Sequence, residues 1–187
     1  MKSAKIVLGI TGASGAIYAW RFMQLIRDRN LPLDLAVVFS KNAKKVWEYE
    51  LKAPYSDIPY KIYPDDDFFV PFASGSSSYE KMVIMPCSMA TIGKIANGIT
   101  DTLITRAADV MLKERKRLVL VPREMPYNAI HLENMYKLTL QGAVICPASP
   151  SFYSFPSTIE DLVDTVLQKV FKLLDLNITF FRWQEKV

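Results

Sequence analysis

The residues best suited to chemistry begin in one turn. Three glycines recur at every third position of residues 9–16, Gly-Ile-Thr-Gly-Ala-Ser-Gly-Ala, between the apolar run Ala4–Leu8 and a helical pattern that starts at Ile17. A strand, a turn of small residues and a helix open many phosphate sites of parallel α/β sheets, because backbone N–H groups there can approach an anion. The glycine spacing differs from that of the dinucleotide-binding fingerprint, and no acidic residue stands at the end of the second predicted strand. A mononucleotide is therefore favoured over NAD. A tight turn without a ligand is the alternative.

Further polar residues follow the other predicted strands. Each set stands directly after an apolar run: Ser40, Cys87–Thr91, Arg123–Glu124 and Ser149–Tyr153. The carboxyl ends of the strands in an open parallel sheet share one edge, and ligand crevices form at that edge. The sequence therefore predicts a crevice that gathers backbone N–H groups, small hydroxyl residues, an Arg–Glu pair and a tyrosine.

Alternating apolar runs and helical patterns predict the elements that position these residues. Five strands are expected, at Lys5–Ile10, Leu33–Phe39, Lys81–Met85, Arg117–Val121 and Ala143–Cys146. Helices are expected to end near Arg29, Leu51 and Ala96, to span Thr102–Lys113 with Asp101 as cap, and to span Asn128–Gln141 before Gly142. The predicted fold class is α/β, a three-layer, Rossmann-like or flavodoxin-like open parallel sheet with helices on both faces.

The last helix has the clearest pattern in the chain. Ser157 and Glu160 have the spacing of a capping box, which predicts the start of the helix there. Lys169 lies off the apolar stripe of this helix. The stripe consists of Ile159, Leu162, Val163, Val166, Leu167, Val170 and Phe171.

The segment from Ala53 to Ser78 breaks the alternation with Pro, Asp, Tyr and Ser. It holds three phenylalanines, Phe68, Phe69 and Phe72. A segment of this length without regular structure usually has a functional or packing role. Two interpretations of this segment are open: a surface loop whose aromatic side chains pack together, and a flap that covers a ligand.

The composition indicates a soluble, cytoplasmic single domain over residues 1–187. Half of the residues are hydrophobic, but no apolar run approaches the ~18 residues of a membrane span. The N-terminal residues suit a first strand better than a signal peptide. The net charge of +4 comes with interleaved acids, which argues against a nucleic-acid stripe and suits a small phosphorylated ligand.

Two cysteines and one histidine limit the metal and redox chemistry. Cys87 and Cys146 each end a predicted strand, so buried reduced thiols are expected. A dedicated zinc site is not expected with a single histidine. His131, inside a predicted helix, is interpreted as a packed or capping side chain rather than a base.

Six motifs together resemble one family, the UbiX flavin prenyltransferases, in the right order and over nearly the whole chain. They are residues 9–16, Pro-Cys-Ser-Met-Ala-Thr at 86–91, Arg-Ala-Ala-Asp-Val at 106–110 with Leu-Lys-Glu at 112–114, Leu-Val-Leu-Val-Pro-Arg-Glu at 118–124, Ile-His-Leu-Glu-Asn-Met at 130–135, and Phe-Tyr at 152–153.

The resemblance implies a metal-independent prenyltransferase. Such enzymes transfer a dimethylallyl group from dimethylallyl phosphate to N5 and C6 of reduced FMN, and the prenylated FMN serves a UbiD-type decarboxylase. They usually assemble as homododecamers. Whether the donor is the mono- or the diphosphate, and which decarboxylase receives the product, stay open.

The resemblance also implies roles for individual residues. Those expected to hold FMN are Gly12, Ala13, Ser14, Ser40, Ser88, Met89, Ala90, Thr91, Arg106 and Arg123. Those expected to meet the prenyl phosphate are Lys113, Arg123, Glu124, Tyr153 and Lys169. The catalytic set would be Ser14, Glu50, Lys113 and Glu124.

The chemistry accounts for these residue types. A phosphate leaving group handled without magnesium needs fixed cations, which Lys and Arg supply. An allylic cation needs an aromatic face, and reduced flavin, Phe68 or Trp183 could offer one. Glu124 either relays protons or orients Arg123 or Lys113 through a salt bridge.

Two positions depart from the family pattern. Lys169 stands where the family mostly has Arg, which keeps the charge but not bidentate binding of phosphate. Ser151 stands where the family has Gly, which affects the approach of Tyr153.

Two other functions remain possible on the sequence. A peptidyl-cysteine-type, FMN-dependent decarboxylase shares the pattern around residues 86–91, but its Asn position is Ala90 here. A non-catalytic flavin carrier would need Ser14 and Ser88, but nothing in it would require Lys113, Glu124 and Tyr153 together.

A large homo-oligomer is expected, with the active site at subunit contacts. Residues 177–187 would form an arm that docks on a neighbouring subunit. The aromatic tail Phe180-Phe181-Arg182-Trp183 follows the last helix and lacks the helical or strand periodicity that would bury it in its own chain.

Overall fold

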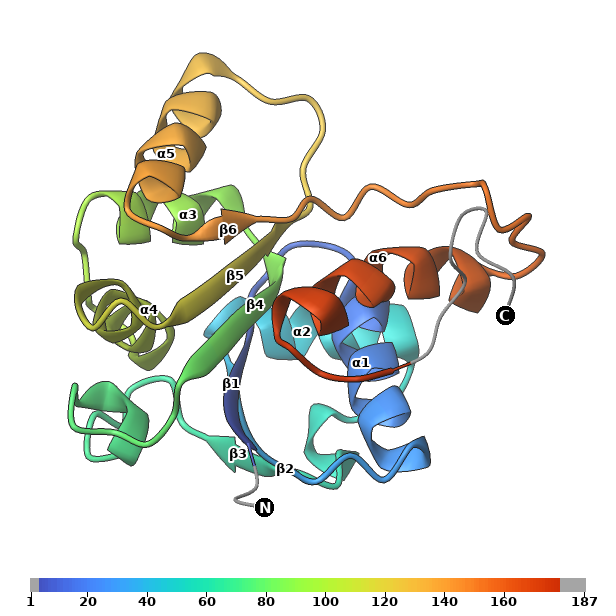
Figure 1. Ribbon diagram of the computed structural model, residues 1–187, viewed down its shortest axis with the longest axis horizontal. Coiled ribbons are helices and arrows are strands. Elements are labelled where there is room, and N and C mark those ends of the chain that lie inside the picture. The colour runs from blue at the N-terminus through green and yellow to red at the C-terminus, as the bar shows by residue number, and fades with distance from the viewer. Residues whose placement is uncertain (1–3, 179–187) are drawn as a thin grey trace.

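The computed structural model describes residues 4–178 and forms one sheet of parallel strands (Figure 1). The strand order is β3-β2-β1-β4-β5-β6. The strands are β1 Ala4–Ile10, β2 Leu33–Phe39, β3 Lys61–Tyr63, β4 Lys81–Cys87, β5 Arg117–Pro122 and β6 Val144–Ile145. This order, with β1 at the point where the winding reverses, confirms the predicted doubly wound α/β fold.

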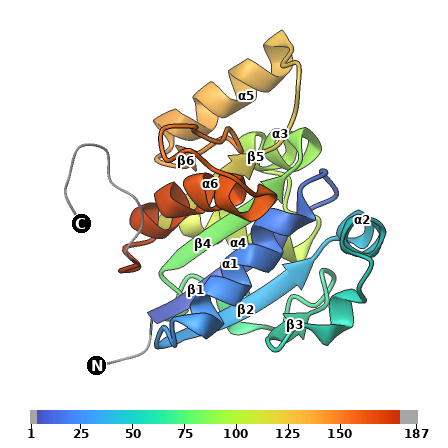
Figure 2. The same cartoon turned by 90° about the vertical axis from the view of Figure 1, so that its right-hand side faces the viewer.

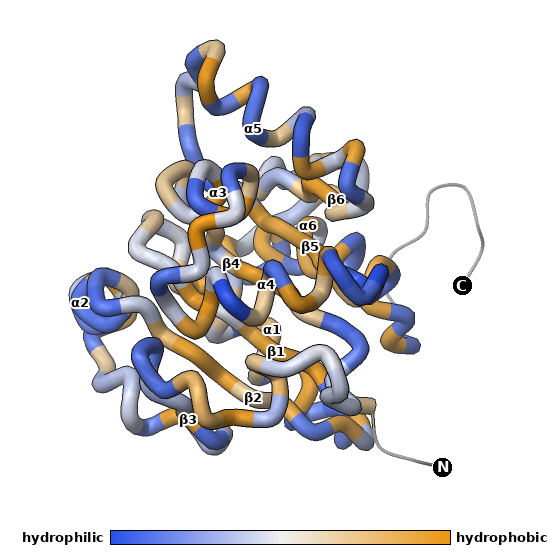
Figure 3. The backbone as a smooth tube through the Cα atoms, turned by 90° about the vertical axis from the view of Figure 1, so that its left-hand side faces the viewer, coloured by the Kyte–Doolittle hydropathy of each residue, from blue (hydrophilic) through white to orange (hydrophobic). Residues whose placement is uncertain are grey.

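Helices cover both faces of the sheet. They are α1 Ala16–Asp28, α2 Lys41–Leu51, α3 Met89–Ala96, α4 Leu103–Lys113, α5 Ala129–Leu140 and α6 Ile159–Leu173. Figure 2 looks onto the face covered by α1, α2 and α6, and Figure 3 shows α3 and α4 in front of the opposite face. This is the three-layer arrangement that the alternation of elements predicts.

Side-chain alternation along the strands builds two separate cores. Ile6, Leu8 and Ile10 of β1 pack with Phe22 of α1 and Phe171 of α6, whose rings stack with centroids 4.7 Å apart. Val7, between them in sequence, belongs to the core under α3 and α4. Strands covered on both faces are apolar throughout, which explains why β1, β2, β4 and β5 are recognisable as continuous apolar runs.

The sequence-based prediction of five strands is wrong by one, because β3 lies inside the segment expected to lack regular structure. Lys61–Tyr63 pairs in parallel with Ala36–Val38 at the edge of the sheet. Three partly exposed residues between Pro59 and Pro64 carry no detectable period. Short 3₁₀ turns at Tyr55–Asp57 and Pro71–Ala73 complete this segment.

The three phenylalanines of the same segment have different environments. Phe72 is buried against Tyr63 and Tyr79, with ring centroids 5.1 and 5.3 Å away. Phe69 is fully exposed and Phe68 is 41% exposed. Only Phe72 therefore packs as the aromatic-loop interpretation requires.

Two predicted helix caps are displaced by one residue. Thr102, not Asp101, caps α4 in a capping box with Thr105, and Asp101 instead lies 2.7 Å from the Lys94 ammonium. Thr158 and Asp161, not Ser157 and Glu160, form the capping box of α6.

The apolar stripe predicted for the last helix is correct except at its first member. Ile159, the first residue of α6, is 67% exposed. The other members of the stripe are buried or partly buried.

Two smaller expectations hold. His131 caps α5, since its Nδ1 accepts a hydrogen bond from Asn128 N at 3.4 Å. Cys87 and Cys146 are buried free thiols, and burial raises the pKa of both. Among the described residues, no helix combines the length and apolar character needed to cross a membrane.

Candidate active site

A pocket lined by hydroxyl groups opens at the carboxyl edge of the sheet, where the sequence predicts a crevice. We call this space of about 410 Å³ the hydroxyl pocket. Its lining residues are Thr11, Gly12, Ser40, Lys41, Asn42, Asp65, Ser88, Ala90, Thr91, Lys94, Thr102, Ile104 and Thr105. It therefore gathers Gly12, Ser40, Ser88, Ala90 and Thr91 of the predicted cofactor residues.

Three helices begin at the hydroxyl pocket. Ser40 caps α2, Ser88 caps α3 and Thr102 caps α4, each accepting from the backbone N–H three residues on at 3.3 Å. Helix N-termini carry partial positive charge, which favours an anion at α2 and α3, whereas the Asp65 carboxylate already accepts from Ile104 N at the start of α4. The surrounding hydroxyls can also exchange hydrogen bonds with a polyol.

The end of β1 is tied to the end of β4 beside this pocket. The Thr11 hydroxyl donates to Pro86 O at 2.8 Å, and its oxygen accepts from Ser88 N at 2.8 Å. Gly12 follows, and a Cβ there would lie 2.7 Å from Asn42 Cβ. Glycine is needed at position 12 because the turn passes directly over the first turn of α2.

The N-terminus of α1 holds a carboxylate of the protein itself, which the glycine pattern did not predict. Glu50 Oε2 accepts from Gly15 N at 2.9 Å and from Ala16 N at 2.8 Å. Gly15 adopts φ +110°, a conformation that side chains other than glycine's rarely adopt. These two N–H groups, expected to meet a phosphate, are satisfied by Glu50, and the N-termini of α2 and α3 at the hydroxyl pocket are left for a ligand.

Arg123 lies on the other side of the same turn. Its Nε donates to Ser14 O at 2.9 Å, which ties the end of β5 to the turn after β1. Arg123 and Glu124 line a second space of about 390 Å³, the Arg123 pocket, with Ser149 on its far wall.

Glu124 is not held by a cation. Its Oε1 accepts from Met125 N at 3.0 Å, and none of the ion pairs among residues 4–178 includes it. Arg123 is oriented by Ser14, and Lys113 pairs with Glu114. The salt-bridge interpretation of Glu124 therefore has no support in a single chain.

Lys169 lines a third space, of about 350 Å³, which shares Ser149 with the Arg123 pocket. We call it the Lys169 pocket. Ser151 also lines it, and Tyr153 follows on the same connection, 65% exposed. The carboxyl edge of the sheet thus brings Ser14, Glu50, Arg123, Glu124 and Lys169 to one side of the molecule. Ala13 and Met89 are buried and support this edge from below.

Lys113 and Arg106 do not join this group within one chain. Ile104 and Thr105 at the start of α4 line the hydroxyl pocket, but Lys113 ends this helix of 11 residues, about 12–14 Å further along its axis. Arg106 Nε donates to Ala73 O at 3.1 Å, and Lys113 Nζ and the Glu114 carboxylate crowd Gly75. The two cations share a helix face, as predicted, and that face meets residues 73–75.

Several lining residues of the hydroxyl pocket were not predicted. Lys41, Asn42 and Thr105 come from the first turns of α2 and α4, Thr102 is the cap of α4, and Lys94 lies in the last turn of α3. Correct placement of the helix caps would have found the threonines.

Asp65 was not predicted either, and it arrives from the segment after β3. It accepts from Ile104 N at 3.0 Å, and burial raises the pKa of its carboxyl. No sequence signal marks it, because the contact spans 39 residues.

The described part of the chain contains no group of three or more His, Cys, Asp or Glu side chains placed to hold a metal ion.

Comparison with known proteins relates the chain to flavin enzymes. A family model described as Flavoprotein matches residues 1–171. Flavin prenyltransferase UbiX of Thermoplasma acidophilum is 46% identical over 183 residues, covering 96% of this chain and 99% of that protein.

Two crystal structures are also similar. AnUbiX (PadA1) in complex with FMN and dimethylallyl pyrophosphate has a TM-score of 0.90 and 38% identity, covering 97% of this chain and 100% of that one. The dodecameric FMN-dependent UbiX-like decarboxylase of Escherichia coli O157:H7 has a TM-score of 0.91, 38% identity and the same coverage.

Replacing Glu50 by Gln tests the contact that occupies the α1 N-terminus. We expect the free energy of unfolding to fall by about 1–2 kcal/mol, because an amide loses the charge that interacts with two N–H groups and the helix dipole. Denaturant unfolding measures this change. Glu48→Gln, an exposed acid on the same helix, is the matched control and should change stability by less than about 0.5 kcal/mol. Equal effects of the two substitutions would contradict a specific role for Glu50.

Proposed function

This chain belongs to the UbiX family of flavin prenyltransferases, and we propose that it transfers a dimethylallyl group to reduced FMN between the hydroxyl pocket and the Arg123 pocket. The observation that carries this assignment is the adjacency of two anion sites across one turn. Three helix N-termini lie on one side of residues 11–15, and the Arg123 guanidinium lies on the other. Two phosphorylated molecules can therefore bind side by side.

The hydroxyl pocket suits FMN. The N-termini of α2 and α3 would hold its phosphate, and the hydroxyls of Thr11, Ser88 and Thr91 would bind the ribityl chain. The close approach that Gly12 permits keeps the pocket open beside Asn42. FMN in its reduced form supplies the nucleophilic ring atoms that accept the dimethylallyl group.

Arg123 and Lys169 would hold the phosphate of the prenyl donor. Their pockets share Ser149, so a phosphate near that residue can approach both cations. Charge-assisted contacts of this kind stabilise the negative charge that grows on the phosphate as the carbon–oxygen bond breaks. Tyr153, on the same connection as Ser151, would supply a hydroxyl to this phosphate.

Glu124 would move a proton at its Oε2 atom. Two bonds to the flavin form, while the carbon–oxygen bond and the π bond of the dimethylallyl group break. Two protons therefore leave the flavin, one for the released phosphate and one for the alkene carbon that does not bond to the flavin. Met125 N holds Oε1 at 3.0 Å, which orients the carboxylate. A carboxylate beside a phosphate site weakens anion binding, and proton transfer accounts for its presence there.

Lys113 and Arg106 would act in the site of a neighbouring copy. Arg106 contacts Ala73 O and Lys113 lies beside Gly75, so their shared helix face meets residues 73–75 and not Arg123. We therefore propose a homododecamer with active sites at subunit contacts, in line with the dodecameric relative. Residues 179–187, which include Phe180 to Trp183, lie outside the described residues, so the docking arm remains a prediction.

The product, prenylated FMN, would pass to a UbiD-type decarboxylase in the cytoplasm. The recipient follows from the family resemblance, and the location follows from the composition of the chain.

Anaerobic incubation with reduced FMN and dimethylallyl phosphate tests the function. We expect the extracted flavin to be heavier by one prenyl unit, with or without EDTA, because Arg123, Lys169 and Lys113 balance the phosphate charge. Parallel reactions with the diphosphate identify the donor. Bound but unmodified flavin would indicate the carrier alternative. Activity that EDTA abolishes and magnesium restores would refute the assignment of these cations.

Replacing Glu124 by Gln tests proton transfer. An amide keeps the size and the contact to Met125 N but cannot take up a proton, so the rate of flavin prenylation should fall by about 10²- to 10⁴-fold with FMN affinity retained. Glu133→Gln on the exposed surface of α5 is the matched control. Near-normal turnover, or a loss confined to FMN affinity, would make Glu124 a structural residue only.

Co-assembly of two inactive variants tests the shared site. Homo-oligomers of Lys113→Ala and of Arg123→Ala should each lose about 10- to 100-fold in activity. Mixed oligomers should regain part of it, because some contacts pair an intact Lys113 with an intact Arg123. Arg123→Ala mixed with Glu124→Gln is the control and should regain nothing, since both residues serve the same site from one chain. A fully active Lys113→Ala homo-oligomer would exclude Lys113 from the site.

A further inference from the structure

Helix α5 lies at the outer edge of the molecule, beside the edge strand β6 (Figures 1 and 2). Its inner side packs mainly on α3 and β6. The residues that this side buries are Asn134, Met135 and Leu138. A surface helix with one covered side is normally polar on the side that faces water.

The outer side of α5 is apolar as well. Leu132, Tyr136 and Leu140 are spaced four residues apart, so they form one row along the helix, which we call the α5 stripe. They are 55, 64 and 65% exposed, respectively. A helix that is apolar on both sides is normally buried on both, so the α5 stripe indicates a surface that another molecule covers.

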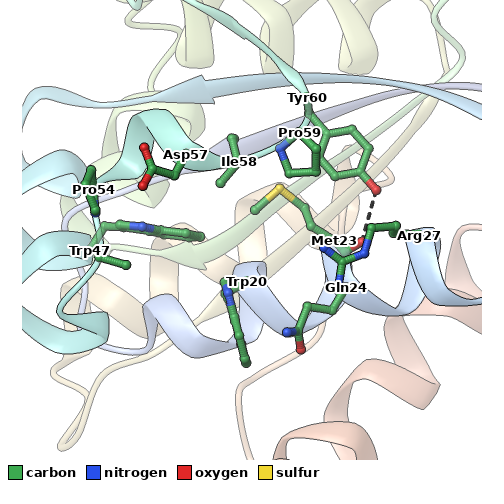
Figure 4. A pocket seen from close by; sticks show the side chains of 11 residues that line it. Trp20, Met23, Gln24, Arg27, Trp47, Pro54, Asp57, Ile58, Pro59 and Tyr60 are labelled. Atoms are coloured by element: carbon green, nitrogen blue, oxygen red, sulfur yellow. Dashed lines mark hydrogen bonds between the residues drawn. The ribbon is translucent and has the colours of Figure 1, made fainter.

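Other apolar helix faces are covered by the chain itself. In Figure 4, Met23 of α1 and Trp47 of α2 lie beside residues 54–60, and both side chains are almost fully buried. The Tyr60 hydroxyl donates to Met23 O at 3.0 Å, which fixes this connection on α1. Nothing in the part of the chain that the structure describes covers the α5 stripe in a comparable way.

A second copy of this chain fits the α5 stripe. The similar UbiX-like structure described above is dodecameric. Dodecamers with dihedral or tetrahedral symmetry contain twofold axes, and the contact at a twofold axis joins the same patch of both copies. A patch in such a contact must therefore be complementary to itself.

The α5 stripe is complementary to itself when two α5 helices lie antiparallel. With the twofold axis at Tyr136, Leu132 of each copy faces Leu140 of the other, and the two tyrosine rings meet. Glu133 and Lys137 lie on one flank of the stripe, three residues before its centre and one residue after it. Antiparallel pairing therefore places Glu133 of each copy within about 3 Å, along the helix axis, of Lys137 of the other.

We propose that the α5 stripe is the surface through which two copies pair around a twofold axis of the homododecamer. This inference rests on the assembly proposed above and adds the surface that joins its copies. The contact that completes the active site would involve Lys113 beside Gly75, so the α5 contact would be a second interface of the same assembly.

A charge placed on the α5 stripe tests the proposal on the purified full-length protein. Tyr136→Glu should convert the dodecamer into smaller assemblies, trimers or hexamers, because two carboxylates would meet at the twofold axis. Tyr136→Phe is the matched control and should keep the dodecamer, since the ring contact remains. Light scattering measures the mass, and circular dichroism verifies that each variant is folded.

Cross-linking provides a second measurement. Under oxidising conditions Tyr136→Cys should form disulfide-linked dimers, because a residue at a twofold axis lies close to its own copy. Ile130→Cys is the control: this position is exposed on the same helix but away from the axis, so it should not cross-link to itself. Cys87 and Cys146 are buried and would not contribute.

The outcomes separate this inference from the proposed function. A folded Tyr136→Glu variant with the wild-type mass, or a dodecamer of Tyr136→Cys that does not cross-link, would overturn the α5 contact and leave the proposed function standing. A wild-type protein that forms no oligomer would contradict the α5 contact and the shared active site together. Both expected effects in a protein that does not prenylate FMN would support the α5 contact and refute the proposed function.

Discussion

The contact between the Glu50 carboxylate and the N–H groups of Gly15 and Ala16 determines how the site is arranged. It satisfies the N-terminus of α1 from within the chain, at 2.9 and 2.8 Å, and joins α2 to α1. Because Asp65 likewise accepts from Ile104 N at the start of α4, a ligand phosphate is left with the N-termini of α2 and α3 at the hydroxyl pocket. Because the turn from Thr11 to Gly15 is held on one side by Glu50 and on the other by Arg123, it separates two anion sites instead of forming one.

The layered fold also explains why one chain carries only part of the chemistry. A helix that connects two parallel strands must begin at the carboxyl edge of the sheet and end at the amino edge. Helix α4 begins with Ile104 and Thr105 at the hydroxyl pocket and ends with Lys113 beside Gly75. Lys113 therefore lies away from Arg123 within one chain, so the assembly of copies is a necessary part of the proposed mechanism.

Local chemistry made most of the fold predictable. Strands β1, β2, β4 and β5 are covered on both faces and are apolar throughout, so their positions follow from the sequence alone. The caps of α4 and α6 were displaced by one residue, because Asp101 and Thr102, or Ser157 and Thr158, are both able to cap and only the backbone path selects one of them. Strand β3 was not predicted, because its three residues lie at the edge of the sheet and show no apolar periodicity in the sequence.

The sequence by itself determined the fold class, the family and the set of polar residues that follow strand ends, because strand and helix periods and the residues after each strand are local properties. Only the tertiary structure decided which of these residues meet. In the folded chain, Glu50 binds the N–H groups at the start of α1, Asp65 lines the hydroxyl pocket, and Lys113 lies away from Arg123. The first two outcomes depend on contacts between residues 34 or more positions apart, and the third depends on the length and direction of a helix. None of these can be recognised from the spacing of residues in the sequence.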